Sequence, residues 1–297
     1  MDATKAHAIL CNIAVICVGT MALGLVISWW LRRDLTTAGI PMQGKVKTDP
    51  YHIMDLGAAA FLIILHLSPL IAVATLTPEA AEAAEATEAT EATEATEATG
   101  KESNGVSIHS AISLAFFSLV LGICVFVFAS VLRGRKPGTV FGLSRLSPSS
   151  ILCWAVSAVL VAYPLMIGFS LLQKMFFDPG EELQKAVEIL LESDNNALRI
   201  VLIISATIVA PLVEEIIFRG YLYAVIKRYS GCVFAAITTS LLFAVVHGNL
   251  PGMLPLFILA LILTLAYELT GCLWVPIVAH SLFNLFNISQ MYLIQNG

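Results

Sequence analysis

Two adjacent glutamates, Glu214 and Glu215, lie in an apolar stretch at residues 200–224, and Arg219 follows them by one helical turn. A charge at membrane depth costs about 2.5 to 3.5 kcal/mol, so it is kept mainly where it faces a cavity, a partner or a substrate. Residues four apart share a helix face, which predicts a buried ion pair between Glu215 and Arg219. Glu214 points away and has no partner in its own helix. An unpaired carboxylate in a desolvated site suits a general base acting on water.

Two further polar clusters follow in the next apolar spans. His247 comes four residues after Phe243, and His280 comes four residues before Asn284, with Asn287 one turn later. Each spacing places its members on one helix face. One such group alone is typical of helix packing, and Asn284 alone would usually link two helices. Polar groups turned inward from three successive helices are instead typical of a site in a bundle core.

These clusters resemble a known family. Residues 211–224 (PLVEEIIFRGYLYA) are similar to the EExxxR motif of the CPBP family, the CAAX-protease and bacteriocin-processing intramembrane proteases, which include the Ras-converting CAAX endopeptidase. Residues 243–247 (FAVVH) resemble its FxxxH motif, and residues 274–284 (WVPIVAHSLFN) resemble its HxxxN motif. The resemblance covers about residues 178–294 and contains no departure at the matched positions.

The resemblance also assigns roles to the matched positions. It implies that Glu214 and His247 activate the attacking water. It further implies that His280 and Asn284 stabilise the oxyanion of the tetrahedral intermediate. Glu215 and Arg219 would hold the site together, in agreement with their spacing.

A metal ion is a second reading of the same residues. Glu214, His247 and His280 could supply three ligands to Zn²⁺ and leave a fourth position open. A carboxylate base, an imidazole and two donors also fill every role of a mechanism without metal. The sequence has no HExxH pattern, in which one helix gives two ligands and a base. The family's naming favours zinc, and both mechanisms stay open here.

The composition predicts the elements that position these residues. Of the 297 residues, 58% are hydrophobic and 12% are charged, and the mean hydropathy is +0.86. Soluble domains carry about 25% charged residues, so this composition predicts an integral membrane protein. We expect an all-α polytopic bundle of about eight transmembrane helices, because each needs roughly 20 apolar residues. The predicted spans are residues 8–31, 56–76, 108–132, 151–172, 198–218, 232–247, 253–267 and 273–294.

The chain divides into four predicted parts. Residues 1–77 hold the first two spans, and residues 78–105 form an acidic EAT repeat with seven glutamates three residues apart. A period of three does not match a helical turn, so this repeat is predicted to be a disordered loop. Residues 106–177 hold the third and fourth spans. Residues 178–297 form the catalytic core, which begins with an amphipathic interfacial helix at residues 181–193.

Charge also predicts the orientation. The net charge of −5 includes the seven repeat glutamates, and without them the chain carries +2. Counting Lys and Arg on alternate sides of the spans gives eleven on one side and five on the other. The richer side is predicted to be cytoplasmic. Both termini and the EAT repeat would then be non-cytoplasmic, in a multi-pass protein of the cell membrane.

The predicted function is an intramembrane endopeptidase that acts on a membrane-associated protein or peptide, and the resemblance implies a metalloprotease. Its partners would be that substrate and the lipid bilayer; the basic clusters are topology signals and predict no nucleic-acid binding. The sequence carries no signal for an oligomeric state. One alternative is an ion- or proton-coupled transporter that uses the same polar groups, although the sequence shows no internal repeat. Another is a non-catalytic membrane scaffold or immunity protein.

Overall fold

The computed structural model describes residues 44–49, 51–75, 108–176, 190, 193 and 195–296. The predicted first span and the EAT repeat lie outside these residues, as does nearly all of the predicted interfacial helix. The described part contains helices and turns and no strand. The all-α prediction is therefore confirmed, and the arrangement is that of a polytopic helical membrane protein.

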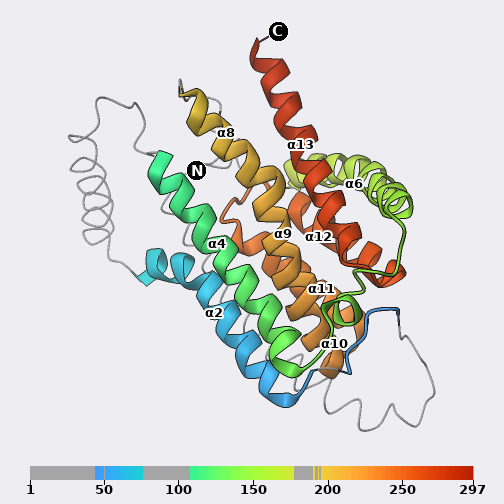
Figure 1. Cartoon of the computed structure of the whole chain (residues 1–297). Coiled ribbons are helices and arrows are strands. Elements are labelled where there is room, and N and C mark those ends of the chain that lie inside the picture. Colours follow the sequence, from blue (N-terminus) through green and yellow to red (C-terminus); the bar gives the residue numbers. More distant parts are fainter. Residues whose placement is uncertain are drawn as a thin grey trace.

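Seven helical rods match the second to the eighth predicted spans (Figure 1). They are α2 (Ile53–Thr75), α4 (Ile108–Ala129), α6 (Pro148–Phe176), the run from α8 to α10 (Asn196–Ser230), α11 (Cys232–Val246), α12 (Met253–Thr270) and α13 (Trp274–Asn296). By length and composition, four stretches of the described part can cross a membrane: residues 108–129, 148–173, 196–230 and 253–270. α11 is shorter, with 15 residues.

The central rod carries both glutamates and extends twelve residues beyond its predicted end at residue 218. It consists of α8 (Asn196–Ile204), the π-helical η2 (Ser205–Val209), α9 (Ala210–Glu215), the π-helical η3 (Ile216–Tyr223) and α10 (Ala224–Ser230). Asn195 caps its start by accepting hydrogen bonds from the N–H groups of Ala197 and Leu198. π-helical turns are rare and are found mostly at functional sites, and here two of them flank Glu214 and Glu215.

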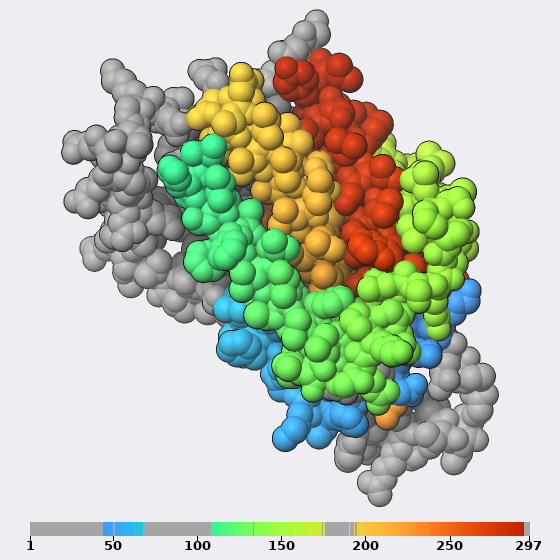
Figure 2. Space-filling model, viewed as in Figure 1, coloured from blue at the N-terminus to red at the C-terminus, as the bar shows by residue number. Residues whose placement is uncertain are grey.

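Four of the described rods, α2, α4, α11 and α13, pack against this central one. α4 packs against α8, α9 and η3, α2 packs against α10 and α11, and α13 packs against η2 and α9. α6 covers the outer side of α12 and α13. Figure 2 shows α4, the central rod, α13 and α6 following one another across one face of the molecule. Glu214 is the nineteenth of the 35 residues of the central rod, so it lies near the middle of the bundle.

Basic residues gather at one end of the bundle. Lys227 of α10 donates to the carbonyl of Val46 at 3.0 Å and forms an ion pair with Glu268 of α12. Arg145 donates to the carbonyl of Lys45 at 3.1 Å. These contacts fix residues 44–49 across the ends of α10 and α12. The assignment of this end to the cytoplasm stays a prediction. The number of Lys and Arg residues counted on that side falls from eleven to ten, because Arg219 lies inside the bundle.

The turn before α6 fixes the start of α13. The N–H of Leu273, the residue just before α13, donates to the carbonyl of Phe141 at 3.0 Å. Gly142 follows with a φ of 65°, and a Cβ there would fall on the carbonyl oxygen of Gly271. Only glycine permits both the left-handed backbone and this close approach.

We therefore expect Gly142→Ala to lower the free energy of unfolding by about 2 kcal/mol or more, because it adds left-handed strain and a backbone clash. Thermal unfolding of the purified protein in detergent measures this loss. Gly168→Ala in α6 is the matched control, since a Cβ at Gly168 meets nothing within 4 Å. Equal midpoints for the two variants would contradict the close approach at Gly142.

Candidate active site

An ion pair between Glu215 and Arg219 lies at the centre of the bundle. Arg219 Nη1 is 2.7 Å from Glu215 Oε1, and the two side chains are 1% and 0% exposed. Arg219 Nη2 donates to the carbonyl of Ala260 at 3.1 Å, and Nε donates to Thr264 Oγ1 at 3.4 Å. The Phe243 ring lies 4.7 Å from the guanidinium carbon. The predicted pair is thus present, and it joins the central rod to α12 and α11.

Glu215 also holds the imidazole of His280. His280 Nδ1 lies 3.0 Å from the same Glu215 oxygen, and its side chain is 4% exposed. A carboxylate paired with a guanidinium accepts hydrogen bonds, so we infer that Nδ1 carries the hydrogen. The second ring nitrogen, Nε2, then faces Glu214.

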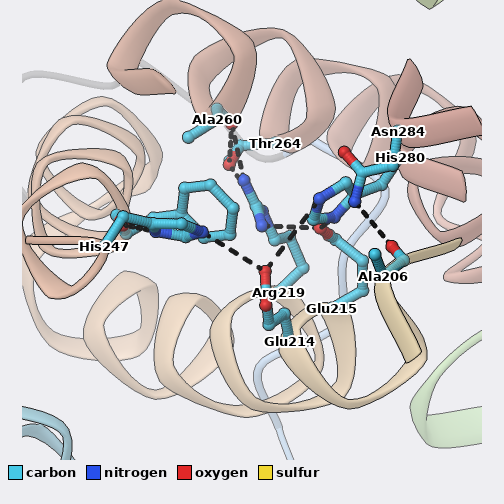
Figure 3. Close-up of polar contacts among 10 residues, drawn as sticks. Ala206, Glu214, Glu215, Arg219, His247, Ala260, Thr264, His280 and Asn284 are labelled. Atoms are coloured by element: carbon cyan, nitrogen blue, oxygen red, sulfur yellow. Dashed lines mark hydrogen bonds and ion pairs between the residues drawn. The ribbon is translucent and has the colours of Figure 1, made fainter. Parts of the chain in front are cut away.

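His247 is fixed in the same way from the opposite side. Its Nδ1 lies 2.6 Å from the carbonyl oxygen of Phe243, which can only accept, so Nδ1 again carries the hydrogen. Its Nε2 also faces Glu214. Figure 3 shows the two imidazoles approaching the Glu214 carboxylate from opposite sides.

Glu214 lies between the two rings without touching either. Its Oε2 is 3.9 Å from His247 Nε2 and 4.0 Å from His280 Nε2, and it has no hydrogen-bond partner within the described residues. These distances are too long for direct hydrogen bonds and suit an atom that bridges the three groups. Glu214 is 27% exposed, whereas Glu215 is fully buried. Adjacent residues of the same type thus have different environments.

The two asparagines of α13 have different partners. Asn284 Nδ2 donates to the carbonyl of Ala206 in η2 at 2.8 Å. Asn287 Oδ1 accepts from the hydroxyl of Tyr163 in α6 at 2.7 Å. Asn284 therefore borders the site, and Asn287, which extends the same stripe in the sequence, links α13 to α6 instead.

A short helix explains how His247 reaches the level of Glu214. α11 has 15 residues and rises about 22 Å, so it ends inside the bundle rather than at its far surface. Gly248, with a φ of 62°, turns the chain directly after His247. The following turn is closed by Asn249, which accepts from the N–H of Gly252. His247 thus lies at the end of a short rod, at the same depth as the glutamate in the middle of a long one.

Two partners of the site were not identified from the sequence. The carbonyl of Ala260 and the hydroxyl of Thr264 complete the hydrogen bonding of Arg219, and both lie on α12. Their signal is a pair of small residues four apart in a helix otherwise rich in Leu and Ile. Small residues let a neighbouring helix or a large polar side chain approach closely. That pattern is common in packed membrane helices, so by itself it does not indicate a role.

The donor atoms of the three predicted zinc ligands are of the types that zinc binds, but the distances between them are too long. One carboxylate oxygen and two imidazole nitrogens converge, and each imidazole donates its other N–H to a protein acceptor, as metal-binding histidines do. Tetrahedral bonds of about 2.0 Å imply ligand separations of about 3.3 Å, shorter than those of Glu214 here. As they lie, no group of three or more His, Cys, Asp or Glu in the described part of the chain is arranged to hold a metal ion.

Comparison with known proteins agrees with this geometry. Residues 196–286 match the family model of Rce1-like proteins, type II CAAX prenyl endopeptidases. The chain is also 27% identical over 163 residues to "Putative membrane peptidase YdiL" of Bacillus subtilis, covering 55% of this chain and 66% of that protein. These matches support the resemblance of this chain to the CPBP family. The matched region, residues 196–286, contains all six predicted site residues.

A second comparison covers a smaller part of each chain. The chain is 33% identical over 133 residues to an Escherichia coli protein described as "Uncharacterized 24.3 kDa protein", covering 43% of this chain and 58% of that one. No solved structure matches the chain. The chain thus spans less than two thirds of the length of both curated relatives. At the family level the match is to CAAX-type membrane proteases, and the apolar helices agree with a location in the membrane.

We expect Glu215→Ala to lower the free energy of unfolding by about 3 to 5 kcal/mol, because it leaves the Arg219 charge buried without its partner. Thermal unfolding in detergent, read by circular dichroism, is the measurement. Glu215→Leu combined with Arg219→Met is the matched control, since it removes both charges at similar volume and should recover much of the loss. A Glu215→Ala midpoint equal to that of the wild type would contradict the buried pair.

Proposed function

We propose that this protein is an intramembrane endopeptidase that hydrolyses a peptide bond of a membrane-associated protein or peptide. The carrying observation is the convergence of Glu214 Oε2 with the Nε2 atoms of His247 and His280 at 3.9 and 4.0 Å. The resemblance to the CPBP family and the match to the Rce1-like family model support it. Activation of water inside a membrane needs a carboxylate base that is shielded from lipid and held near hydrogen-bond donors.

In the proposed reaction, Glu214 and His247 activate the water. A water bound between Glu214 Oε2 and His247 Nε2 adds to the carbonyl carbon of the peptide bond, and its proton passes to Glu214. The C–N bond of the tetrahedral intermediate then breaks as Glu214 returns that proton to the leaving amine. His247 can accept from the water because its Nδ1–H is held by the carbonyl of Phe243.

His280 and Asn284 stabilise the oxyanion in this proposal. Asn284 Nδ2 has two hydrogens, and the carbonyl of Ala206 accepts one of them, so the other can donate to the intermediate. His280 donates from Nε2 when it carries a second proton. Positioned donors of this kind contribute about 2.7 to 4 kcal/mol each to transition-state stabilisation.

Zinc is the alternative form of this proposal, in which Glu214, His247 and His280 serve as its ligands instead of as base and donors. A bound Zn²⁺ would supply Lewis acidity and a water that loses its proton near neutral pH. The donor types support this, since a carboxylate and two imidazoles are ligands that zinc commonly takes in proteins.

We expect Glu214→Ala and His247→Ala to lower the rate of hydrolysis at least about a hundredfold, since each removes a group that handles the reacting proton. Purified protein in liposomes, given a membrane-delivered peptide library read by mass spectrometry, provides the measurement. His109→Ala on the exposed side of α4 is the matched control and should cleave like the wild type.

Wild-type rates in Glu214→Ala and His247→Ala would overturn the protease proposal. Ion flux in the same liposomes that disappears with Glu214→Gln, together with no cleavage, would favour the transporter alternative. Comparison of the membrane proteomes of cells with wild-type and Glu214→Gln protein would identify the substrate by a new terminus that the variant does not produce.

We expect the chelator 1,10-phenanthroline to abolish hydrolysis by the wild type and added Zn²⁺ to restore it, with about one zinc per chain by elemental analysis. His280→Ala should lose the bound zinc, because it removes one of three ligands. Full activity of a zinc-free preparation would assign water activation to Glu214 and His247 alone and leave the protease proposal standing.

A further inference from the structure

A proline interrupts the hydrogen bonding of the central rod three residues before Glu214. In η2 the N–H of Ala210 donates to the carbonyl of Ser205, five residues earlier, which is the π-helical spacing. The same spacing assigns the next carbonyl, that of Ala206, to the N–H of residue 211. Residue 211 is proline and has no N–H, so the rod itself cannot supply this donor.

The missing donor comes from α13. Asn284 Nδ2 donates to the carbonyl of Ala206 at 2.8 Å, from a side chain 78 residues further along the sequence. An unsatisfied carbonyl inside a membrane costs several kcal/mol, and neighbouring helices commonly satisfy the groups that a proline leaves free. The carbonyl of Ala206 is therefore a strong hydrogen-bond acceptor that holds the side-chain amide of Asn284.

This bond fixes the direction of the Asn284 amide. A terminal amide rotates over a broad range when nothing holds it. With one Nδ2 hydrogen on Ala206, the planar group has its second hydrogen in a defined direction, one helical turn from His280. Pro211 is buried and lies four residues before Glu215, so the proline and the carboxylate that holds His280 are on the same face of the rod.

We propose that Pro211 is a positioning residue for hydrolysis, which acts by leaving the carbonyl of Ala206 to Asn284. This inference rests on the proposed function. Pro211 touches neither the water nor the peptide; it removes the backbone donor that would compete for Ala206. The helix loses one internal hydrogen bond, and the site gains an oriented donor.

Pro211→Ala tests this, because it restores an N–H that competes with Asn284 for the carbonyl of Ala206. We expect kcat to fall about tenfold with little change in KM, less than the loss from deleting an oxyanion donor outright. Pro164→Ala is the matched control: it removes a proline from the interior of α6, on the exposed side, and should leave kcat unchanged.

Two double-mutant comparisons separate positioning from a structural effect. If Pro211 acts through Asn284, Pro211→Ala should cost no further activity in the Asn284→Ala background. In thermal unfolding, Asn284→Ala should lower the midpoint clearly in the wild type and much less with Pro211→Ala, where the backbone N–H takes over the carbonyl. The same fold loss in both backgrounds, the same midpoint shift in both, or wild-type kcat in Pro211→Ala would overturn the inference. The midpoints do not depend on hydrolysis, so a wild type without any peptidase activity counts against the proposed function alone.

Discussion

The site depends on one buried negative charge, the Glu215 carboxylate. A carboxylate without solvent contact is costly unless a positive charge and hydrogen bonds compensate it, and a single oxygen of Glu215 receives both Arg219 and His280. Arg219 in turn requires acceptors for its remaining N–H groups, which α12 provides. This one charge therefore determines how α9, η3, α12 and α13 must approach each other.

The same charge separates the roles of two adjacent glutamates. Glu215 is fully buried and binds Arg219 and His280 through Oε1, whereas Glu214 is partly exposed and its Oε2 faces two imidazoles at 3.9 and 4.0 Å. Pairs of like groups in different environments are characteristic of acid and base sites. In the proposed protease, Glu215 stabilises the fold and Glu214 takes part in the chemistry. The two side chains point in different directions because neighbouring residues of a helix are about 100° apart around its axis.

Irregular helix geometry brings the reacting groups to one depth. Two π-helical stretches flank the glutamates, and the short α11 ends at His247 instead of crossing the bundle. The wider turn at η2, together with Pro211, exposes a carbonyl to which α13 binds through Asn284. Regular helices of equal length would leave His247 near one surface and Glu214 at the centre.

The sequence alone determined the membrane class, the all-helical fold, seven of the helices now described and the pairing of Glu215 with Arg219. Those features follow from hydropathy and from contacts within one helix, which depend on nearby residues only. Only the tertiary structure decided that Asn287 binds Tyr163 rather than the site, that Ala260 and Thr264 complete the Arg219 shell, and that His247 and His280 reach Glu214 together. These are contacts between separate helices, and they depend on helix lengths, π-helical turns and packing that no local spacing encodes.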